Sequence, residues 1–281
     1  MLDNLSGGRL IAGFVRGIGC EYHASMANPG QSHERFHEAH DLIVQAWTRP
    51  GPFEFAGKHF HIQYVNLWPR PYQEPHPPIW IPSQGSRETI EWASHPDRRY
   101  TYLQTFSPID SVAKYMQQYR DTAVAYGYQP TTDQLGWAVP VYVAETDEKA
   151  LREAKPHAEN FYAKFIKSPL EYRLPPGYTS MSSMKAMIES KFKYSLASPD
   201  MDALVSRGMI ICGSPSTVVE KLEAYQARLG FRNLISMMQF ATLPHELTMK
   251  SMAMFAAEVM PRLRSVGEPT GRPVRSMAAA K

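Results

Sequence analysis

Short apolar runs alternate along this chain with longer stretches of helical periodicity, and this order constrains the fold more than any other feature. Repeated strand-then-helix units with apolar strands predict an α/β protein with a parallel sheet covered by helices. Pattern alone leaves a doubly wound sheet and a (β/α)8 barrel open, although the units follow one another at about the pitch of a barrel. We expect five barrel strands, at Leu10–Val15, Ile79–Ile81, Tyr100–Gln104, Leu135–Ala144 and Asn233–Gln239.

The clearest helix is expected from Ser32 to Thr48, where apolar residues recur at helical spacing. His33, His37 and His40 lie on or near this helix, and no HExxH motif accompanies them. We therefore expect the three histidines on its solvated side, and we expect no metal site. The apolar face of this helix comprises Phe36, Ala39, Leu42, Ile43, Ala46 and Trp47.

Two segments interrupt the alternation of strands and helices. Residues 53–62 read as a small β-hairpin around Ala56-Gly57, and a proline-rich connector at 69–78 follows it. Residues 168–207 form an irregular, Met-containing insertion, which we expect to act as a mobile lid. Met209–Cys212 is interpreted as an additional short strand rather than a barrel member. We expect one domain over residues 1–264 and a disordered tail over 265–281.

The composition is that of a globular protein, with 43% hydrophobic and 20% charged residues among 281. The net charge is +3, and basic residues are interleaved with acidic ones, so no nucleic-acid-binding patch is indicated. No stretch approaches the length of a membrane span. Two cysteines, Cys20 and Cys212, are too few for a disulfide framework. We therefore expect a cytoplasmic protein that binds neither nucleic acid nor membranes.

The stretch from Pro77 to Ser94 has the parts that can hold an anion. An apolar run is followed by the polar turn Ser83-Gln84-Gly85-Ser86 and then by a helix start. The first N–H groups of a helix lack internal partners, and the helix dipole favours negative charge there. Ser86 and Thr89, three residues apart, could both reach one phosphate. Considered alone, Ser86 is better explained as an ordinary helix cap.

A second candidate loop, Arg16-Gly17-Ile18-Gly19, follows the first strand. It lacks the full GxGxxG spacing, so it does not count as a dinucleotide-binding motif. Further short sequence phrases occur along the chain in a fixed order with these two loops. They are Leu5-Ser6-Gly7-Gly8-Arg9, Arg35-Phe36-His37-Glu38-Ala39, Pro77-Pro78-Ile79-Trp80, Glu91-Trp92-Ala93, Gly213-Ser214-Pro215-Ser216-Thr217-Val218 and Phe255-Ala256-Ala257-Glu258-Val259-Met260-Pro261.

Together and in this order, these phrases resemble the luciferase-like flavin-dependent monooxygenase family, from Leu2 to about Arg264. The resemblance implies a TIM-type barrel that binds reduced FMN, or in a sister branch F420, at the carboxyl ends of the strands. In this family oxygen adds to the reduced flavin, and the resulting peroxyflavin oxidises a small organic substrate. The resemblance also implies a separate flavin reductase that delivers the reduced flavin. Homodimers are typical of the family, and the residues neither support nor oppose one here.

The resemblance also suggests site residues. Arg16, Ser86 and Thr89 match the positions that contact the flavin phosphate, and an arginine can pair bidentately with phosphate. In isolation, Arg16 would be expected to form a surface salt bridge. The remaining suggested positions are Val15 and Ile18 for backbone contacts, Tyr22 near the flavin or in the core, and Ser83 and Gln84 for phosphate or ribityl oxygens.

One departure from the family pattern limits these expectations. Family members carry further strand-helix units before the Leu-Ser-Gly-Gly-Arg phrase, so we expect a barrel that lacks its first three units. Those units supply much of the substrate pocket and a histidine that assists oxygen chemistry, so no catalytic residue is assigned. We expect weak FMN binding and little monooxygenase activity from this chain. The alternatives are an F420-dependent dehydrogenase or reductase, a non-catalytic flavin-binding or partner protein, and, least favoured, a phosphosugar-type barrel enzyme.

Overall fold

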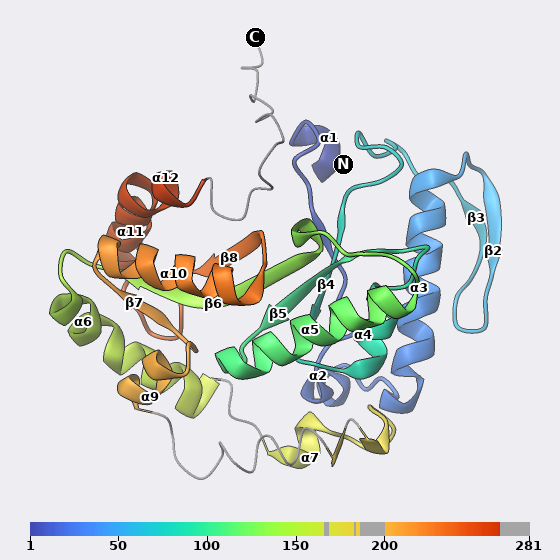
Figure 1. Ribbon diagram of the computed structural model, residues 1–281. Coiled ribbons are helices and arrows are strands. Elements are labelled where there is room, and N and C mark those ends of the chain that lie inside the picture. Colours follow the sequence, from blue (N-terminus) through green and yellow to red (C-terminus); the bar gives the residue numbers. More distant parts are fainter. Residues whose placement is uncertain (166–168, 183, 186–199, 265–281) are drawn as a thin grey trace.

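The computed structural model describes residues 1–165, 169–182, 184–185 and 200–264, and it shows a parallel sheet flanked by helices (Figure 1). The predicted tail at 265–281 and much of the predicted insertion lie outside the described residues. Within the described part of the chain, the sheet has six strands in the order β1-β4-β5-β6-β7, and β8 also pairs with β6. These strands are β1 (Ala12–Gly13), β4 (Ile79–Ser83), β5 (Thr101–Thr105), β6 (Leu135–Val143), β7 (Ile211–Gly213) and β8 (Asn233–Met237).

All five expected strands are present, and β6 is the longest of the sheet. Each residue of β6 is buried, in keeping with a parallel strand covered on both faces. It pairs with β5 from Leu135 to Ala138 and with β8 from Gly136 to Pro140. The end of β6, from Val141, pairs with β7. The run at Met209–Cys212 therefore contributes an additional short strand, as expected. The expectation that it lies outside the sheet of barrel strands is wrong, because β7 pairs with β6 in the main sheet.

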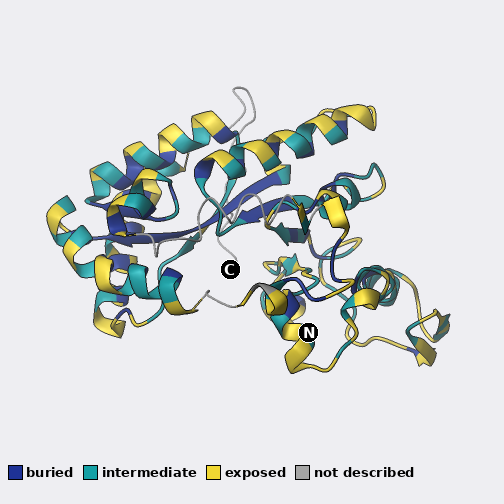
Figure 2. Ribbon diagram, turned by 90° about the horizontal axis from the view of Figure 1, so that it is seen from below, coloured by how far each residue is buried: buried dark blue, intermediate teal, exposed yellow. Residues whose placement is uncertain are grey.

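Helices cover the sheet in two groups, and Figure 2 shows the buried residues concentrated along the strands between them. A first core cluster joins one face of the sheet to α4 (Arg87–Ala93), α5 (Ile109–Ala125) and α10 (Pro215–Leu229). A second cluster joins Tyr142 and Ala144 to α6 (Asp147–Asn160) and α9 (Met201–Ser206). The chain then continues into α11 (His245–Met254), the π-helical turn η4 (Phe255–Val259) and α12 (Met260–Leu263).

Helix α3 (Ser32–Thr48) has the predicted bounds, and the predicted hairpin packs beside it as β2 (Phe53–Ala56) and β3 (His61–Val65). The expectation for the histidines is wrong. His40 is 3% exposed, and its ring lies against Trp92 and Tyr100. His37 stacks on Trp92. These histidines face the rest of the fold because Trp92 and Tyr100 lie on that side of α3.

Short helices lie at the carboxyl end of β1, at the bottom of Figure 1. They are α2 (Gly19–Ala24) and α7 (Leu170–Arg173), and the two are in contact. The remaining short elements are α1 (Leu2–Leu5), η1 (Pro29–Gln31), η2 (Thr132–Gln134) and η3 (Phe161–Phe165). Within the described residues, no helix combines the length and apolar character needed to cross a bilayer.

Candidate functional site

The eight residues suggested for cofactor binding lie on two loops, and in the helices that follow them, at one edge of the sheet. Strands β1 and β4 are neighbours and run parallel, with Ala12 opposite Ile79. Their carboxyl ends therefore meet at the same edge, where ligands bind in parallel α/β sheets. The first loop carries Val15, Arg16 and Ile18 and leads into α2, which carries Tyr22. The second begins at Ser83, the last residue of β4, carries Gln84 and Ser86, and leads into α4, which carries Thr89.

Ser86 is the N-cap of α4, as the simplest interpretation of the sequence predicted. Its Oγ accepts a hydrogen bond from the Thr89 N–H at 3.4 Å. The same hydroxyl donates to Glu88 Oε2 at 2.8 Å, so a carboxylate already occupies its donor position. Ser86 is buried, Thr89 is partly buried and Gln84 is exposed. Ser83 Oγ accepts from the Gly85 N–H at 3.1 Å and thereby stabilises the turn between β4 and α4.

Arg16 is held by hydrogen bonds rather than by a surface salt bridge. Its Nη1 donates to Ser32 Oγ at 2.8 Å and to the carbonyl of Tyr178. Its guanidinium carbon lies 4.1 Å from the centre of the Tyr178 ring, a cation–π contact. The Tyr178 hydroxyl in turn donates to the Gly17 carbonyl at 2.6 Å. The guanidinium is thus fixed at the loop after β1 by α3 and by a segment far away in the sequence.

Tyr22 supports the same loop. Its hydroxyl donates to the backbone carbonyl of Arg16, and its ring lies 5.7 Å from that of Tyr178. Val15 and Ile18, by contrast, are 62% and 51% exposed. Tyr22 is therefore neither a fully buried core residue nor free to move independently of Arg16. The Ile18 N–H donates to Glu21 Oε2 at 2.8 Å, so the backbone of this loop is hydrogen-bonded within the protein while both apolar side chains are exposed.

This arrangement occurs in a chain that a sequence model of the luciferase-like monooxygenases matches over residues 1–232. The chain belongs to this family. A relative, the uncharacterized protein y4wF of Sinorhizobium fredii, is 38% identical over 95 residues. That match covers 34% of this chain and 27% of the relative, so the aligned part spans about a quarter of the relative's length.

Solved structures show the luciferase-like barrel fold at sequence identities too low to show more than the fold. Monooxygenase RslO1 from Streptomyces bottropensis has a TM-score of 0.69 and 22% identity, covering 93% of this chain and 71% of that one. The oxygenating constituent of 3,6-diketocamphane monooxygenase from Pseudomonas putida, in complex with FMN, has a TM-score of 0.68 and 21% identity. This match covers 93% of this chain and 73% of that one. The F420-dependent tetrahydromethanopterin reductase of Methanopyrus kandleri has a TM-score of 0.62 and 19% identity. This match covers 92% of this chain and 76% of that one. The sheet described above is thus part of a luciferase-like TIM-type barrel.

The luciferase-like chain has site residues that its sequence alone did not indicate. Glu88 Oε1 accepts from Ser180 Oγ at 2.5 Å, while Oε2 accepts from Ser86. Tyr178 and Ser180 therefore bridge the two loops, one contacting Arg16 and the other Glu88. Glu88 could have been noticed as an acidic residue in the first turn of a helix, where carboxylates are favoured. No local pattern could have shown Tyr178 or Ser180, because they are far from both loops in the sequence.

His33 reports that the two loops share one electrostatic environment. Burial lowers the pKa of His33, and the nearby positive charge of Arg16 lowers it further. The Glu88 carboxylate acts in the opposite direction and raises the pKa of His33. One imidazole thus lies within range of both Arg16 and Glu88. His33 therefore lies close enough to the charged groups beside both loops to be affected by each of them.

The donor groups of this site are suited to a phosphate. A guanidinium and hydroxyls are the groups that bind phosphate in proteins, and Arg16, Ser86 and Thr89 supply them. The Tyr178 carbonyl and the Glu88 carboxylate already accept hydrogen bonds from the first two. Beside them, Thr179 Oγ1 is buried and has no hydrogen-bond partner among the described residues. The residues therefore fit a phosphate when Tyr178 and Glu88 give up these hydrogen bonds.

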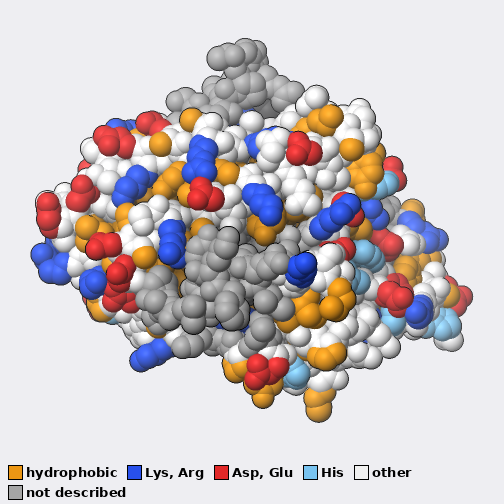
Figure 3. All heavy atoms as spheres, turned by 60° about the horizontal axis from the view of Figure 1, so that its bottom comes forward, with side chains coloured by type: hydrophobic (Ala, Val, Ile, Leu, Met, Phe, Trp, Pro, Cys, Tyr) orange, Lys and Arg blue, Asp and Glu red, His pale blue; other side chains and the backbone are white. Residues whose placement is uncertain are grey.

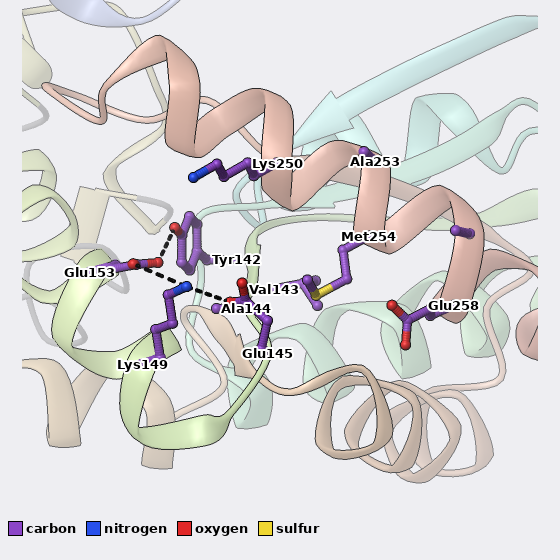
Figure 4. A pocket seen from close by; sticks show the side chains of 11 residues that line it. Tyr142, Val143, Ala144, Glu145, Lys149, Glu153, Lys250, Ala253, Met254 and Glu258 are labelled. Carbon is purple, nitrogen blue, oxygen red and sulfur yellow. Dashed lines mark hydrogen bonds and ion pairs between the residues drawn. The ribbon is translucent and has the colours of Figure 1, made fainter.

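Two hollows are lined by neither Arg16 nor Ser86, although Val15 of the first loop lines the second of them. One, of about 450 Å³, opens beside the end of β6. Lys149 and Lys250 lie near the Tyr142–Glu153 hydrogen bond of 2.8 Å, and Glu258 lies at the opposite end of this hollow (Figure 4). The other, of about 490 Å³, lies between β1 and α3. Among the described residues, no group of three or more His, Cys, Asp or Glu side chains could hold a metal ion. Figure 3 shows acidic and basic side chains mixed over the underside of the molecule.

Proposed function

We propose that this chain is a flavin-dependent oxidoreductase that uses reduced FMN and O2 to monooxygenate a small apolar organic substrate. The observation that carries this proposal is the placement of phosphate-binding side chains on adjacent loops in a luciferase-like chain. Arg16 follows β1, and Ser86 and Thr89 follow β4. A separate flavin reductase supplies the reduced flavin, and we place the protein in the cytoplasm. An FMN complex among the similar structures supports the choice of cofactor.

The proposed binding mode assigns a task to each loop. Arg16, Ser86 and Thr89 hold the phosphate, and the backbone around Val15 and Ile18 lines the same end of the cofactor. Ser83 and Gln84 face the phosphate or ribityl oxygens. Tyr22 positions Arg16 through its hydrogen bond to the Arg16 carbonyl. A bound reduced flavin would supply the electrons for O2 activation, while the protein orients it and excludes water.

F420 is the alternative cofactor, in which case the chain would be a dehydrogenase or reductase. F420-dependent enzymes occur among the structures with the same fold, including the reductase described above and a secondary alcohol dehydrogenase. Calorimetric titration of this chain with reduced FMN and with F420 shows which of the two cofactors it binds more tightly. Tighter binding of F420 would favour the dehydrogenase or reductase. Binding of FMN without oxidation of any substrate would favour a non-catalytic flavin-binding protein.

A double variant, Ser86→Ala with Thr89→Ala, tests the phosphate site. We expect FMN affinity to fall about tenfold or more, because each change removes a hydrogen bond to a charged group. The matched control is Ser214→Ala with Thr217→Ala. Ser214 caps α10 by the same contact, accepting from the Thr217 N–H at 3.4 Å. The control should lower the melting temperature and leave FMN affinity unchanged.

Equal FMN affinity in the Ser86/Thr89 variant, together with a lowered melting temperature, would contradict the proposal and leave Ser86 as a helix cap only. The sequence-based prediction of weak FMN binding and little monooxygenase activity is tested in the same preparation. Steady turnover by this chain with FMN, a reductase and an accepted substrate would show that prediction to be wrong.

A further inference from the structure

We propose that the segment from Leu174 to Ser180, named here the strap, competes with the cofactor phosphate for the same donor groups. This inference rests on the proposed function. In the structure described above, the strap is docked on the loops after β1 and β4. Binding of a phosphate and docking of the strap then oppose each other. Cofactor binding would release the strap from the site, and a docked strap would lower the apparent affinity for the cofactor.

The first contact of the strap is with Arg16. The carbonyl of Tyr178 accepts a hydrogen bond from Arg16 Nη1, and the Tyr178 ring packs 4.1 Å from the guanidinium carbon. The Tyr178 hydroxyl donates to the Gly17 carbonyl at 2.6 Å. The carbonyl, the ring and the hydroxyl of one tyrosine thus all contact the loop after β1. Its carbonyl accepts a hydrogen bond from Arg16, the same side chain that would donate to a phosphate oxygen.

The second contact of the strap is with the loop after β4. Ser180 Oγ donates to Glu88 Oε1 at 2.5 Å, and Glu88 Oε2 accepts from Ser86 Oγ at 2.8 Å. Docking of Ser180 therefore helps to hold the Glu88 carboxylate at the hydroxyl of Ser86. In that position the carboxylate accepts the Ser86 hydrogen bond itself. Its negative charge also repels an incoming phosphate.

The strap and Arg173 just before it pack closely against residues 19–30, which follow the loop after β1. A Cβ atom on Gly19 would lie 2.2 Å from the Arg173 carbonyl oxygen, and one on Gly177 would lie 2.9 Å from the Gly30 Cα. Leu174, Pro175 and Tyr178 are buried. This packing holds the strap and Arg173 closely against α2 and η1. The strap must move away before another molecule can reach Arg16 from this side.

The docked strap also carries a cost that its release removes. Thr179 Oγ1 is buried without a hydrogen-bond partner among the described residues, and an unsatisfied buried hydroxyl opposes the docked state. A phosphate offers three charged acceptor oxygens, whereas the strap offers one backbone carbonyl to Arg16. Exchange of the strap for a phosphate therefore replaces a neutral acceptor by a charged one and exposes Thr179 to water.

The test uses two variants that loosen the strap without changing a proposed phosphate ligand, Tyr178→Leu and Ser180→Ala. We expect each to tighten the binding of FMN to the full chain about three- to tenfold, because a competitor has been weakened. The control is Tyr172→Leu, since Tyr172 lies just before the strap and is 47% exposed. It should leave FMN affinity unchanged. Weaker or unchanged FMN binding in both strap variants would overturn the competition, and weaker binding would identify the strap as part of the cofactor site.

A second measurement follows the strap directly. Limited chymotrypsin cleavage after Tyr178 should become several-fold faster when FMN is added, and Tyr64 on the hairpin, 67% exposed, serves as the reference site. In ligand-free protein, Arg16→Ala should also speed this cleavage, because it removes the donor that holds the Tyr178 carbonyl. Unchanged or slower cleavage on addition of saturating FMN would overturn the proposal.

The Arg16→Ala variant separates failure of this inference from failure of the proposed function. If FMN binds equally well with and without Arg16, the proposed phosphate site is wrong, and the competition falls with it. If FMN affinity depends on Arg16 but not on the strap variants, only the competition is wrong. If Arg16 and the strap variants affect FMN affinity in opposite directions, both proposals are supported.

Discussion

At the scale of single residues, the histidines of α3 differ most from what their spacing suggested. His40 Nε2 lies 2.8 Å from the Tyr100 hydroxyl, and His40 Nδ1 lies 3.0 Å from Asp41 Oδ1. His37 stacks on Trp92 with ring centres 5.1 Å apart and planes 5° apart. Burial, together with the smaller effect of the nearby His33, lowers the pKa of His37 to about 4. These side chains are therefore neutral parts of the packing between α3 and α4.

His37 should make the stability of the protein depend on pH. The pKa of His37 in the folded state lies below 6.5, the ordinary value for a histidine side chain. The unfolded chain therefore binds the proton more readily. The stabilisation is present above about pH 6.5 and is lost as the pH falls towards 4. We expect His37→Phe, which keeps an aromatic ring against Trp92, to reduce the loss of unfolding free energy between pH 7 and pH 4 by about 1–2 kcal/mol, after allowance for partial exposure.

Urea unfolding at several pH values measures this effect. The control is His61→Gln, because His61 is exposed and pairs with Glu54 at the surface. An unchanged pH dependence in His37→Phe would show that the imidazole of His37 is not the group that titrates.

At the scale of elements, two carboxylates of α3, Glu38 and Glu34, join the hairpin to the helix. Glu38 Oε1 accepts from the backbone N–H groups of His59 and Phe60 at 2.8 and 2.7 Å. Glu34, one turn earlier, accepts from Lys58 Nζ at 2.7 Å and lies 3.0 Å from His59 Nε2. The turn between β2 and β3 thus donates two of its backbone N–H groups to a carboxylate of α3. The hairpin is held to the helix by its turn.

Glu38→Ala should loosen the hairpin while leaving the sheet intact. We expect hydrogen exchange of the β2 and β3 amides to become several-fold faster, because two turn N–H groups lose their acceptor. Gly57→Ala should have the same effect, since a Cβ there would lie 1.9 Å from Glu38 Oε1. Glu54→Gln, which changes an exposed carboxylate of the same hairpin, is the control. Faster exchange throughout the main sheet in Glu38→Ala would contradict this assignment.

At the scale of the whole molecule, β6 joins the two core clusters. Trp137, Val139 and Val141 belong to the first cluster, and Tyr142 belongs to the second. Neighbouring residues of one buried strand thus contact different helices on opposite faces. Because the strand cannot leave one cluster without disturbing the other, we expect residues 1–264 to unfold as one cooperative unit.

Leu204→Ala tests this expectation in the second cluster, where Leu204 is fully buried. The change should lower the unfolding free energy by about 2–5 kcal/mol. Tryptophan fluorescence reports the rest of the protein, because the described residues of the second cluster include no tryptophan. Thiol labelling of Cys212 reports the second cluster, since burial raises the pKa of the Cys212 thiol to about 12 and protects it in the folded state.

In a Cys20→Ser background, both probes should change at the same urea concentration in the wild-type chain and in Leu204→Ala. Labelling of Cys212 at a urea concentration where the fluorescence is still native would show two separate units and would contradict a single domain.

The sequence by itself determined the features that depend on short-range pattern. Apolar runs marked all five expected strands, and the periodicity of residues 32–48 gave both ends of α3. Ser86 was recognised as an N-cap because capping involves residues only three positions apart. The ordered phrases also placed the chain in its family. The phosphate-binding role of the loops after β1 and β4 stays a prediction.

Only the tertiary structure decided which groups meet at these loops. Arg16 contacts Tyr178 across 162 positions of the sequence, and Ser180 contacts Glu88 across 92. His40 became buried because Tyr100, 60 positions later, lies over it. Periodicity describes how residues face within one element, whereas these partners depend on how distant segments pack. For that reason the sequence indicated where a phosphate could bind, and the fold alone revealed the strap that occupies the same donors.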